Sequence, residues 1–390
     1  MRRPRRSVAY LLALGITFTT FVTAIQIAGA APVSPNPGAS RNELRGVDAV
    51  SSSDVWAVGN YLNDTASAYQ ALIIHWNGTE WSQVTSPDPS STENDLLGVS
   101  AISSSNAWAV GTYFTTIWNT LILHWDGATW SQVTSPNPSL NVNGLSAVTA
   151  ISASNVWAVG TYYNDSTLKT DTLVLHWNGT KWSKAQSPNP SAVNALYGVS
   201  AFSSSDVWAV GSQSSSNEPG SPSYTLVLHW NGTKWSKVAS PRPSSTFNVV
   251  RGVSAVDGSN AWAVGSYIND ASSILDTLIL RWNGARWSKA TSPNPGSSDN
   301  SLSGVSALST SDAWAVGSYY TLAGYQALIL HWNGTRWSKS ASPNPSPTEN
   351  HLYAVDARSS SNAWAVGFYD SAGVWDTFTV RWNGTKWSQK

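Results

Sequence analysis

The chain has 390 residues, with 22 Lys and Arg, 22 Asp and Glu, and no cysteine. Without cysteine it can form neither a disulfide nor a cysteine-linked lipid anchor. Only 11% of the residues are charged, against about a quarter in ordinary soluble domains, and the balance of charge argues against nucleic acid as a partner.

The first 30 residues have the pattern of an export signal. Arg2, Arg3, Arg5 and Arg6 precede an apolar stretch over 8–27, and Ala28-Gly29-Ala30 is a small-residue cleavage pattern. We expect cleavage after Ala30 and a secreted protein with 18 basic and 22 acidic residues. An uncleaved anchor is the alternative, because the apolar stretch is long. No later segment is long and apolar enough to span a membrane.

From residue 34 onward the chain repeats one segment of 49 to 53 residues. The frame of the repeat reads S-P-N-P, then N-x-L-x-G-V-S-A, S-S-S-D-V-W-A-V-G-S-Y, T-L-I-L-H-W-N-G and T-K-W-S-K. The seven copies span 34–85, 86–134, 135–186, 187–239, 240–291, 292–341 and 342–390. A near-uniform period of this size indicates an array of identical supersecondary units.

Each copy contains four short runs that are rich in β-branched and aromatic residues. In chain order they are represented by 98–102, 156–160, 172–177 and 181–184. Ser, Asn, Gly and Pro bound these runs, as is typical of strands. Asn-Gly, or Asp126-Gly127 in copy two, lies between the third and fourth runs and predicts a tight hairpin.

Four antiparallel strands repeated in this way predict an all-β fold, a seven-bladed β-propeller over 31–390. Apolar residues on both faces of each blade would be buried against the neighbouring blades. An open β-solenoid is the alternative, but it requires atypical capping repeats, and the sequence has none. We expect a monomer.

The segments D-V-W-A-V-G and H-W-N-G-T-K-W resemble repeats of secreted bacterial β-propellers of the Asp-box and kelch-like type. The resemblance covers 34–390 and implies a propeller architecture. It departs from the sialidases that contain Asp-boxes, because the arginines here do not recur as their central triad. The paired glycines of true kelch repeats are also missing.

Tryptophan is the most unusual residue of the chain, with 23 copies. Of these, 21 occupy three fixed positions of the repeat, which are Trp56, Trp76 and Trp81 in copy one. We expect these rings to pack between blades, since burying one indole removes about 200 Å² from water. Sugar stacking is the alternative role for these rings.

Two tryptophans lie outside the three fixed positions and are better candidates for binding. Trp118 and Trp375 precede the third strand, and Tyr69 and Tyr325 hold the equivalent position in copies one and six. This position belongs to the face that carries the 2–3 loops and the 4–1 crossovers, which vary among copies. Exposed aromatic rings beside amides and carboxylates suit a sugar, whereas local cover of the loop is the alternative.

Two further repeat positions open onto the same face. Tyrosine occurs two residues after the W-A-V-G glycine at Tyr61, Tyr113, Tyr162, Tyr267, Tyr319 and Tyr369. Asparagine precedes the first strand at Asn42, Asn94, Asn143, Asn194, Asn248, Asn300 and Asn350. We expect the tyrosines to contribute to a binding rim or to the core, and the asparagines to cap the crossovers.

If the first strand is innermost, its middle residue lines the channel, and Asp48 and Asp356 become neighbours in a closed ring. Two adjacent carboxylates can bind a cation such as Ca²⁺ or act as an acid/base pair. A solvated channel lining is the alternative. We expect no metal site at the recurrent His, because its copies are carried apart around the ring, and we expect no resident cofactor.

These observations favour a secreted, non-catalytic binding module whose ligand is a carbohydrate, held on the long-loop face. A protein partner is the second hypothesis. A glycoside hydrolase or polysaccharide lyase with Asp48 and Asp356 as its acids is the alternative from a different class, and a structural role at the cell surface is a further one.

Overall fold

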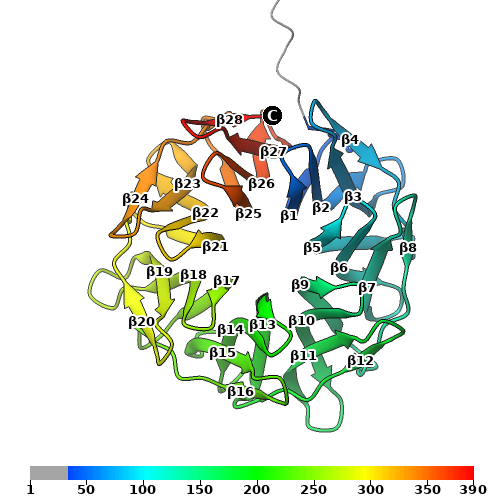
Figure 1. Cartoon of the computed structure of the whole chain (residues 1–390), viewed down its shortest axis with the longest axis horizontal. Coiled ribbons are helices and arrows are strands. Elements are labelled where there is room, and N and C mark those ends of the chain that lie inside the picture. The colour runs from blue at the N-terminus through cyan, green and yellow to red at the C-terminus, as the bar shows by residue number, and fades with distance from the viewer. Residues whose placement is uncertain (1–33) are drawn as a thin grey trace, which may run out of the picture. The chain divides into compact units, whose positions relative to one another are not determined.

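The computed structural model describes residues 34–390, and the predicted export signal lies outside them. The described residues form 28 strands and no helix. The strands repeat as units of four antiparallel neighbours, and the units are arranged around a central axis (Figure 1). The prediction of four strands per repeat is confirmed, and the first strand of each unit is the innermost.

The four strands of a unit differ in length and in distance from the axis. The innermost strands are β1 (Asn42–Ser51), β5 (Glu93–Ser103), β9 (Asn143–Ser152), β13 (Val193–Ser203), β17 (Asn248–Asp257), β21 (Asn300–Ser309) and β25 (Asn350–Ser359). The second strands are β2 (Asp54–Asn63), β6 (Asn106–Phe114), β10 (Asn155–Asn164), β14 (Asp206–Ser214), β18 (Asn260–Ile268), β22 (Asp312–Thr321) and β26 (Asn362–Ser371). The third strands are β3 (Ala68–Trp76), β7 (Trp118–Trp125), β11 (Lys169–Trp177), β15 (Ser223–Trp230), β19 (Leu275–Trp282), β23 (Gly324–Trp332) and β27 (Val374–Trp382). The short outer strands are β4 (Trp81–Val84), β8 (Trp130–Gln132), β12 (Trp182–Lys184), β16 (Trp235–Lys237), β20 (Trp287–Ala290), β24 (Trp337–Ser340) and β28 (Trp387–Gln389).

The Asn-Gly dipeptide forms the turn between the third and outer strands, as predicted. In the first unit the side-chain oxygen of Asn77 accepts hydrogen bonds from the amides of Thr79 at 2.9 Å and Glu80 at 3.0 Å. Gly78 has a φ of 100°, a conformation that costs glycine little and other residues much more. The asparagine therefore fixes the turn and the glycine permits it.

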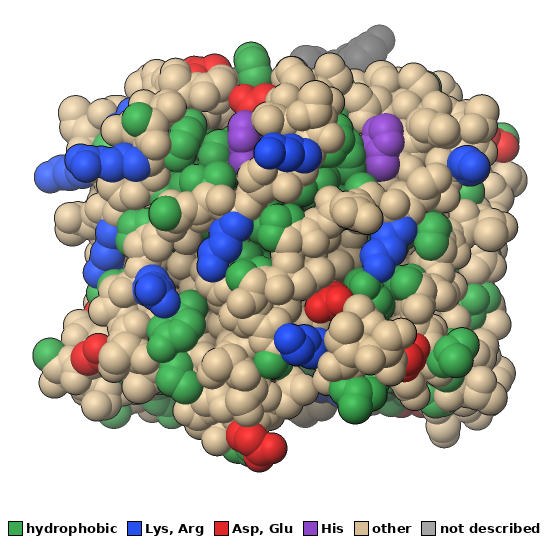
Figure 2. All heavy atoms as spheres, turned by 90° about the horizontal axis from the view of Figure 1, so that it is seen from below, with side chains coloured by type: hydrophobic (Ala, Val, Ile, Leu, Met, Phe, Trp, Pro, Cys, Tyr) green, Lys and Arg blue, Asp and Glu red, His purple; other side chains and the backbone are tan. Residues whose placement is uncertain are grey.

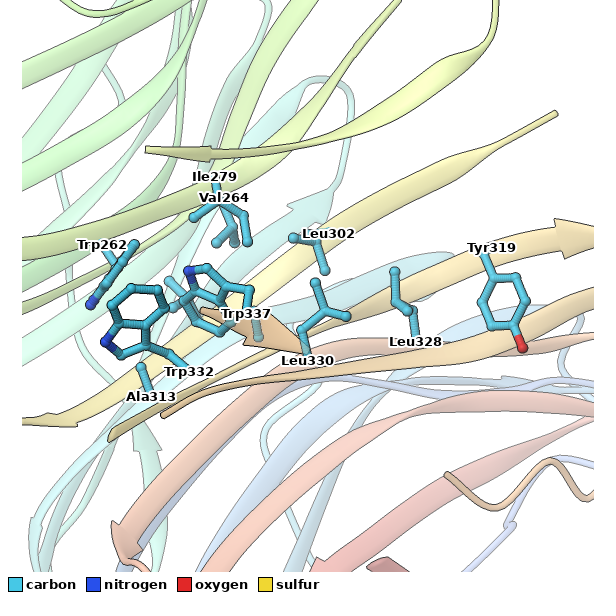
Figure 3. Close-up of a cluster of buried hydrophobic side chains, with 12 residues drawn as sticks. Trp262, Val264, Ile279, Leu302, Ala313, Tyr319, Leu328, Leu330, Trp332 and Trp337 are labelled. Carbon is cyan, nitrogen blue, oxygen red and sulfur yellow. The ribbon is translucent and has the colours of Figure 1, made fainter. Parts of the chain in front are cut away.

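The hydrophobic core lies between neighbouring units and is dominated by the repeated tryptophans. Trp262 of β18 is 1% exposed and contacts Trp332 and Trp337 of the next unit, with ring centroids 4.9 and 5.1 Å apart (Figure 3). The prediction that the repeated tryptophans pack between units is confirmed by this burial. One buried indole contributes a gross stabilisation of about 5 kcal/mol from its area.

The last and first units are joined by the same contacts that join internal neighbours. Trp364 of β26 packs on Trp76 and Trp81 of the first unit at 5.0 and 5.2 Å. The hydroxyl groups of Ser34 and Thr377 lie 2.7 Å apart, and Asn36 accepts a hydrogen bond from the amide of Thr377 at 2.7 Å. The first S-P-N-P segment therefore packs on the last unit, and the arrangement closes.

A second set of contacts links the innermost strands. The side chain in the middle of an innermost strand accepts a hydrogen bond from a backbone amide of the next innermost strand, at 2.7–3.1 Å. The accepting residues are Asp48, Ser100, Ser200, Ser254, Ser306 and Asp356. These side chains connect adjacent units, and because all six remain partly exposed this role is added to the channel lining that the sequence suggested.

Candidate functional site

The innermost strands begin at the edge of the molecule that carries the long loops, and a buried asparagine fixes each beginning. Asn42 is fully buried, accepts a hydrogen bond from the amide of Gly38 at 2.7 Å and donates to the carbonyls of Gly38 and Trp375. All seven equivalent asparagines are fully buried. The predicted capping role of the asparagines is confirmed, and the loops of this edge rest on a rigid base.

Two of the four predicted loop aromatics, Tyr69 and Trp375, lie near one another where the last unit meets the first. Trp375 stacks on Phe368 with ring centroids 4.2 Å apart, and the guanidinium of Arg41 lies 3.8 Å from the centroid of Trp375. Arg41 also donates a hydrogen bond to the hydroxyl of Tyr69 at 2.7 Å. Arg41 therefore links a tryptophan near the end of the chain to a tyrosine near its beginning.

The stacking continues from Phe368 across the last unit. His351 stacks on Phe368 at 5.0 Å and lies against Tyr325 at 4.9 Å, and the hydroxyl of Tyr325 donates to Asp299 at 2.8 Å. We call Tyr325, His351, Phe368 and Trp375 the aromatic row. Burial raises the pKa of Tyr325 to about 12, so this phenol remains protonated and donates.

Charged groups lie beside the aromatic row on the first two units. Arg45 forms an ion pair with Glu43 at 2.9 Å and lies 4.2 Å from the ring centroid of Tyr353. Asn60 donates to Asp95 at 2.5 Å. Burial first, and then the charge of Glu93, raise the pKa of Asp95 to about 6.

These groups surround a cavity of about 360 Å³. Its lining, which we call the join site, consists of Arg41, Glu43, Arg45, Asn60, Tyr69, Glu93, Asp95, Leu97, Tyr353 and Trp375. The volume lies in the range of small-ligand pockets. The cavity combines guanidinium donors, carboxylate and amide acceptors and aromatic rings, so it can recognise a polar ligand with an apolar face.

Trp118 lies outside this site. It packs on Phe114 at 5.3 Å, and its carbonyl accepts a hydrogen bond from Asn143 at 3.1 Å. The structure therefore does not bring Trp118 and Trp375 together, although they occupy the same position of the repeat.

The repeated tyrosines lie between units rather than in the join site. Tyr162, Tyr267 and Tyr319 are no more than 9% exposed, and each hydroxyl accepts a hydrogen bond from a lysine of the outer strand at 2.6 Å. Tyr61, Tyr113 and Tyr369 are partly buried against the same cores. Their rings therefore pack in or against the cores between units.

Asp48 and Asp356 are neighbours, as the closed arrangement requires, and Arg358 bridges them. Its guanidinium lies 3.1 Å from Asp48 and 3.3 Å from Asp356. Burial first, and then the charge of Asp356, raise the pKa of Asp48 to about 7, and burial also raises the pKa of Asp356. Each carboxylate also accepts a backbone hydrogen bond from the next unit, so both have structural partners.

Sequence reasoning missed most of the join site. Glu43, Asp95 and His351 occupy the first variable position of N-x-L-x-G, and Arg45 and Tyr353 occupy the second. At the first position copies three to six have Gly, Ala, Val and Ser. The concentration of charged and aromatic residues at the first position in copies seven, one and two was a signal that the sequence offered, whereas the second position also has Tyr197 and Arg251 in copies four and five.

The recurrent histidines bond to the turn between the first and second strands. His75 lies 2.8 Å from Asp54 and 4.3 Å from the ring centroid of Trp56. Within residues 34–390 no cluster of three or more His, Cys, Asp or Glu has an arrangement that could hold a metal ion. The same residues contain no helix long and apolar enough to cross a membrane.

Neither a known sequence family nor a protein of curated function matches this sequence. By structure, Ycf48 bound to a D1 peptide is similar with a TM-score of 0.56 and 15% identity, over 90% of this chain and 99% of that one. A polysaccharide lyase, an ulvan lyase bound to a glucuronic acid–sulfated rhamnose fragment, is similar with a TM-score of 0.56 and 8% identity, over 93% and 95%. The fold is a β-propeller. The propeller is also similar to the six-bladed fucose lectin of Aleuria aurantia, with a TM-score of 0.43 and 16% identity over 75% of this chain and 92% of the lectin. At these identities the comparisons define the fold and leave the function to the site.

Proposed function

We propose that this protein is a secreted, seven-bladed β-propeller that acts as a non-catalytic, carbohydrate-binding module. In this proposal residues 1–30 are a cleaved export signal, and residues 31–390 form one monomeric domain. The 28 strands in units of four support the blade number.

The join site is the proposed binding site, and its lining is the observation that carries the proposal. Tyr69 and Tyr353 supply aromatic surface, and Trp375 supplies a ring edge because Phe368 and Arg41 lie against its ring. Arg41, Arg45, Glu43, Asp95 and Asn60 supply donors and acceptors around the same cavity. Sugars present both an apolar C–H face and a rim of hydroxyl groups, which suits such a lining. The cavity of about 360 Å³ accommodates one or two sugar rings.

A peptide is the second candidate ligand, and one contact favours it. Arg41 lies over Trp375, so a sugar that stacked on that face would have to displace the guanidinium, whereas a peptide carboxylate could bind to it directly. The two solved propellers with a TM-score of 0.56 are bound to a peptide and to a saccharide, so they support either ligand.

The enzyme alternative has less support than the binding module. Asp48 and Asp356 each accept a backbone hydrogen bond and share Arg358, whereas a catalytic pair requires carboxylates that reach the substrate. A turnover assay on polysaccharides with Asp48→Asn and Asp356→Asn checks this alternative. Turnover that disappears in both variants while binding remains would establish the enzyme.

A glycan and polysaccharide array with the purified protein, with and without calcium, tests the main proposal. We expect sugar binding that is lost in Trp375→Ala and weakened in Asp95→Asn. Trp118→Ala is the matched control, since it removes the same side chain at the same repeat position outside the join site. Absence of binding across a broad array, or equal loss in the Trp118 variant, would contradict the proposal, and binding to a peptide library would favour the second candidate.

A further inference from the structure

The outer strands divide the repeat copies into two groups. The residue two positions after the outer-strand tryptophan is lysine in copies three to six and glutamine in copies one, two and seven. In chain order these residues are Gln83, Gln132, Lys184, Lys237, Lys289, Lys339 and Gln389. The surrounding W-S-x frame is the same in every copy, so the strand accepts either side chain.

A second basic residue precedes the same tryptophan in copies three to seven, and only copies three to six have both basic residues. Together the two positions form what we call the basic rim: Lys181, Lys184, Lys234, Lys237, Arg286, Lys289, Arg336 and Lys339. All eight residues are exposed, and the turns between their third and outer strands contain no Asp or Glu, although Asp171 and Asp276 lie in the third strands β11 and β19. Figure 2 shows Lys and Arg side chains spread across the side of the molecule on which β12, β16 and β20 lie at the bottom of Figure 1. The rim is thus a local positive surface on a chain whose total charge is balanced.

The inner lysine is held over a tyrosine in copies three, five and six, whereas in copy four Lys237 donates to the side-chain oxygen of Gln213 at 3.1 Å. In copy three Lys184 donates to the hydroxyl of Tyr162 at 2.6 Å, and its ammonium lies 3.9 Å from the ring centroid. Lys289 with Tyr267 and Lys339 with Tyr319 repeat both contacts, at 2.6 Å and at 4.0 and 4.2 Å. One tyrosine satisfies only one of the three ammonium protons of a lysine.

Two of the three lysine–tyrosine pairs, at Lys184 and Lys289, face a cavity with polar walls. The cavities have volumes of about 330 Å³ at Lys184 and about 380 Å³ at Lys289. The hydroxyl groups of Thr172 and Ser187 lie 2.7 Å apart at the first, and Asn189 accepts from the amide of Thr172. The hydroxyls of Tyr162 and Tyr267 also lie 3.4 Å from the carboxylates of Asp171 and Asp276. Each phenol is therefore held by a carboxylate as well as by its lysine.

We propose that copies three to six form a second carbohydrate-binding surface, the basic rim, which binds acidic polysaccharides through their carboxylate or sulfate groups. The lysine of each pair receives the anion, and the neighbouring cavity holds the sugar ring that carries it. Because the pairs recur from copy to copy, one polymer chain engages several of them, and the effect of weak individual sites multiplies. This proposal takes from the proposed function only that the ligand is a carbohydrate, and it is independent of the join site.

The closing experiment measures binding to polygalacturonate and dextran sulfate, with neutral dextran, polyglutamate and duplex DNA as comparison polymers. The test variant is Lys184→Gln/Lys289→Gln/Lys339→Gln, in which each new residue is the one that copies one, two and seven already carry. The control variant Lys169→Gln/Lys386→Gln/Lys390→Gln removes the same number of charges outside the basic rim. Gln132→Lys adds a lysine opposite Tyr113 in copy two.

We expect the wild type to bind at least one acidic polysaccharide, the test variant to bind about tenfold or more weakly, and the control variant and Trp118→Ala to bind as the wild type does. Gln132→Lys is expected to bind more tightly. No binding to either acidic polysaccharide, equal weakening in the control variant, or equal affinity for polyglutamate or DNA would overturn the proposal. The proposal for the join site is tested by a separate measurement, the glycan array. It fails if no glycan on the array binds in a way that depends on Trp375.

Discussion

At the scale of single residues, Asp48 is a carboxyl group held largely out of water beside Asp356 and Arg358. Burial and the second carboxylate raise its pKa from 3.8 to about 7. Between those values the unfolded chain has lost the proton that the folded chain still holds. The contribution of Asp48 to the free energy of unfolding therefore falls as the pH rises from about 4 to about 7. Above that range the folded state bears the full cost of the buried carboxylate.

We expect Asp48→Asn to remove this penalty. The amide oxygen can still accept the hydrogen bond from Ala101, so the fold keeps its contact. The difference in melting temperature between the variant and the wild type should be near zero or negative at about pH 4 and should become more positive towards about pH 8. Thermal unfolding followed by circular dichroism across this pH range measures this difference. A difference that does not change with pH would contradict the raised pKa of Asp48.

Asp95 is the titrating group of the join site, with a pKa raised to about 6 by burial and by Glu93. As a carboxylate it accepts hydrogen bonds from sugar hydroxyl groups, and the protonated form accepts fewer. Affinity for a neutral glycan found on the array should therefore rise up to about tenfold between about pH 5 and pH 7.5. Calorimetry at the two values measures this, and Asp95→Asn should show no such rise.

At the scale of elements, each crossover is held by the asparagine that opens the following innermost strand. Asn143 accepts from the amide of Ser139 at 2.8 Å and donates to the carbonyls of Ser139 and Trp118 at 2.9 and 3.1 Å. The side chain is fully buried, so its removal leaves three backbone groups without a partner.

We expect Asn143→Ala to lower the free energy of unfolding by about 1–3 kcal/mol and to speed hydrogen exchange in the crossover before β9. Urea denaturation and exchange mass spectrometry measure the two effects. Asn141→Ala, at an exposed position of the same crossover, is the control and should have a much smaller effect.

The elements were predictable because their residue types recur. The strands, the Asn-Gly turn and the capping asparagines follow from the repeat itself, since each is a local requirement that every copy meets in the same way. The join site does not follow in this way. Arg41 and Trp375 are more than 330 positions apart, and their contact depends on the meeting of the last and first units. Trp118 and Trp375 share a repeat position, but their surroundings differ. The repeat positions of Phe368 and Arg41 hold Thr112 and Val142 beside Trp118, whose ring packs on Phe114 instead.

At the scale of the whole molecule, the join is the one boundary between neighbouring units of the described residues that no crossover peptide spans. Its contacts, including those of Ser34 and Asn36 with Thr377, are the same in kind as the internal ones. Internal neighbours, however, stay at a high effective concentration when their contacts break, because the chain connects them.

We expect native-state hydrogen exchange to be faster in β27, β28 and β1 than in their internal counterparts β15, β16 and β13, because local opening begins where no chain connection opposes it. Ser34→Ala/Asn36→Ala should widen the difference, whereas Ser292→Ala/Asn294→Ala, the internal equivalent, should leave the exchange of β27 and β28 unchanged. Equal hydrogen-exchange rates in the strands at the join and in their internal counterparts would contradict the expectation that opening begins at the join.

The hydrogen bonds between innermost strands have a consequence for how such a chain can evolve. Each accepting side chain meets a backbone amide of its neighbour, and every non-proline residue has that amide whatever its side chain is. Adjacent copies therefore do not need matched partners at this contact. A gene segment that encodes one copy can be exchanged for another by recombination without loss of the contact, and copies can then diverge separately in their loops and outer strands.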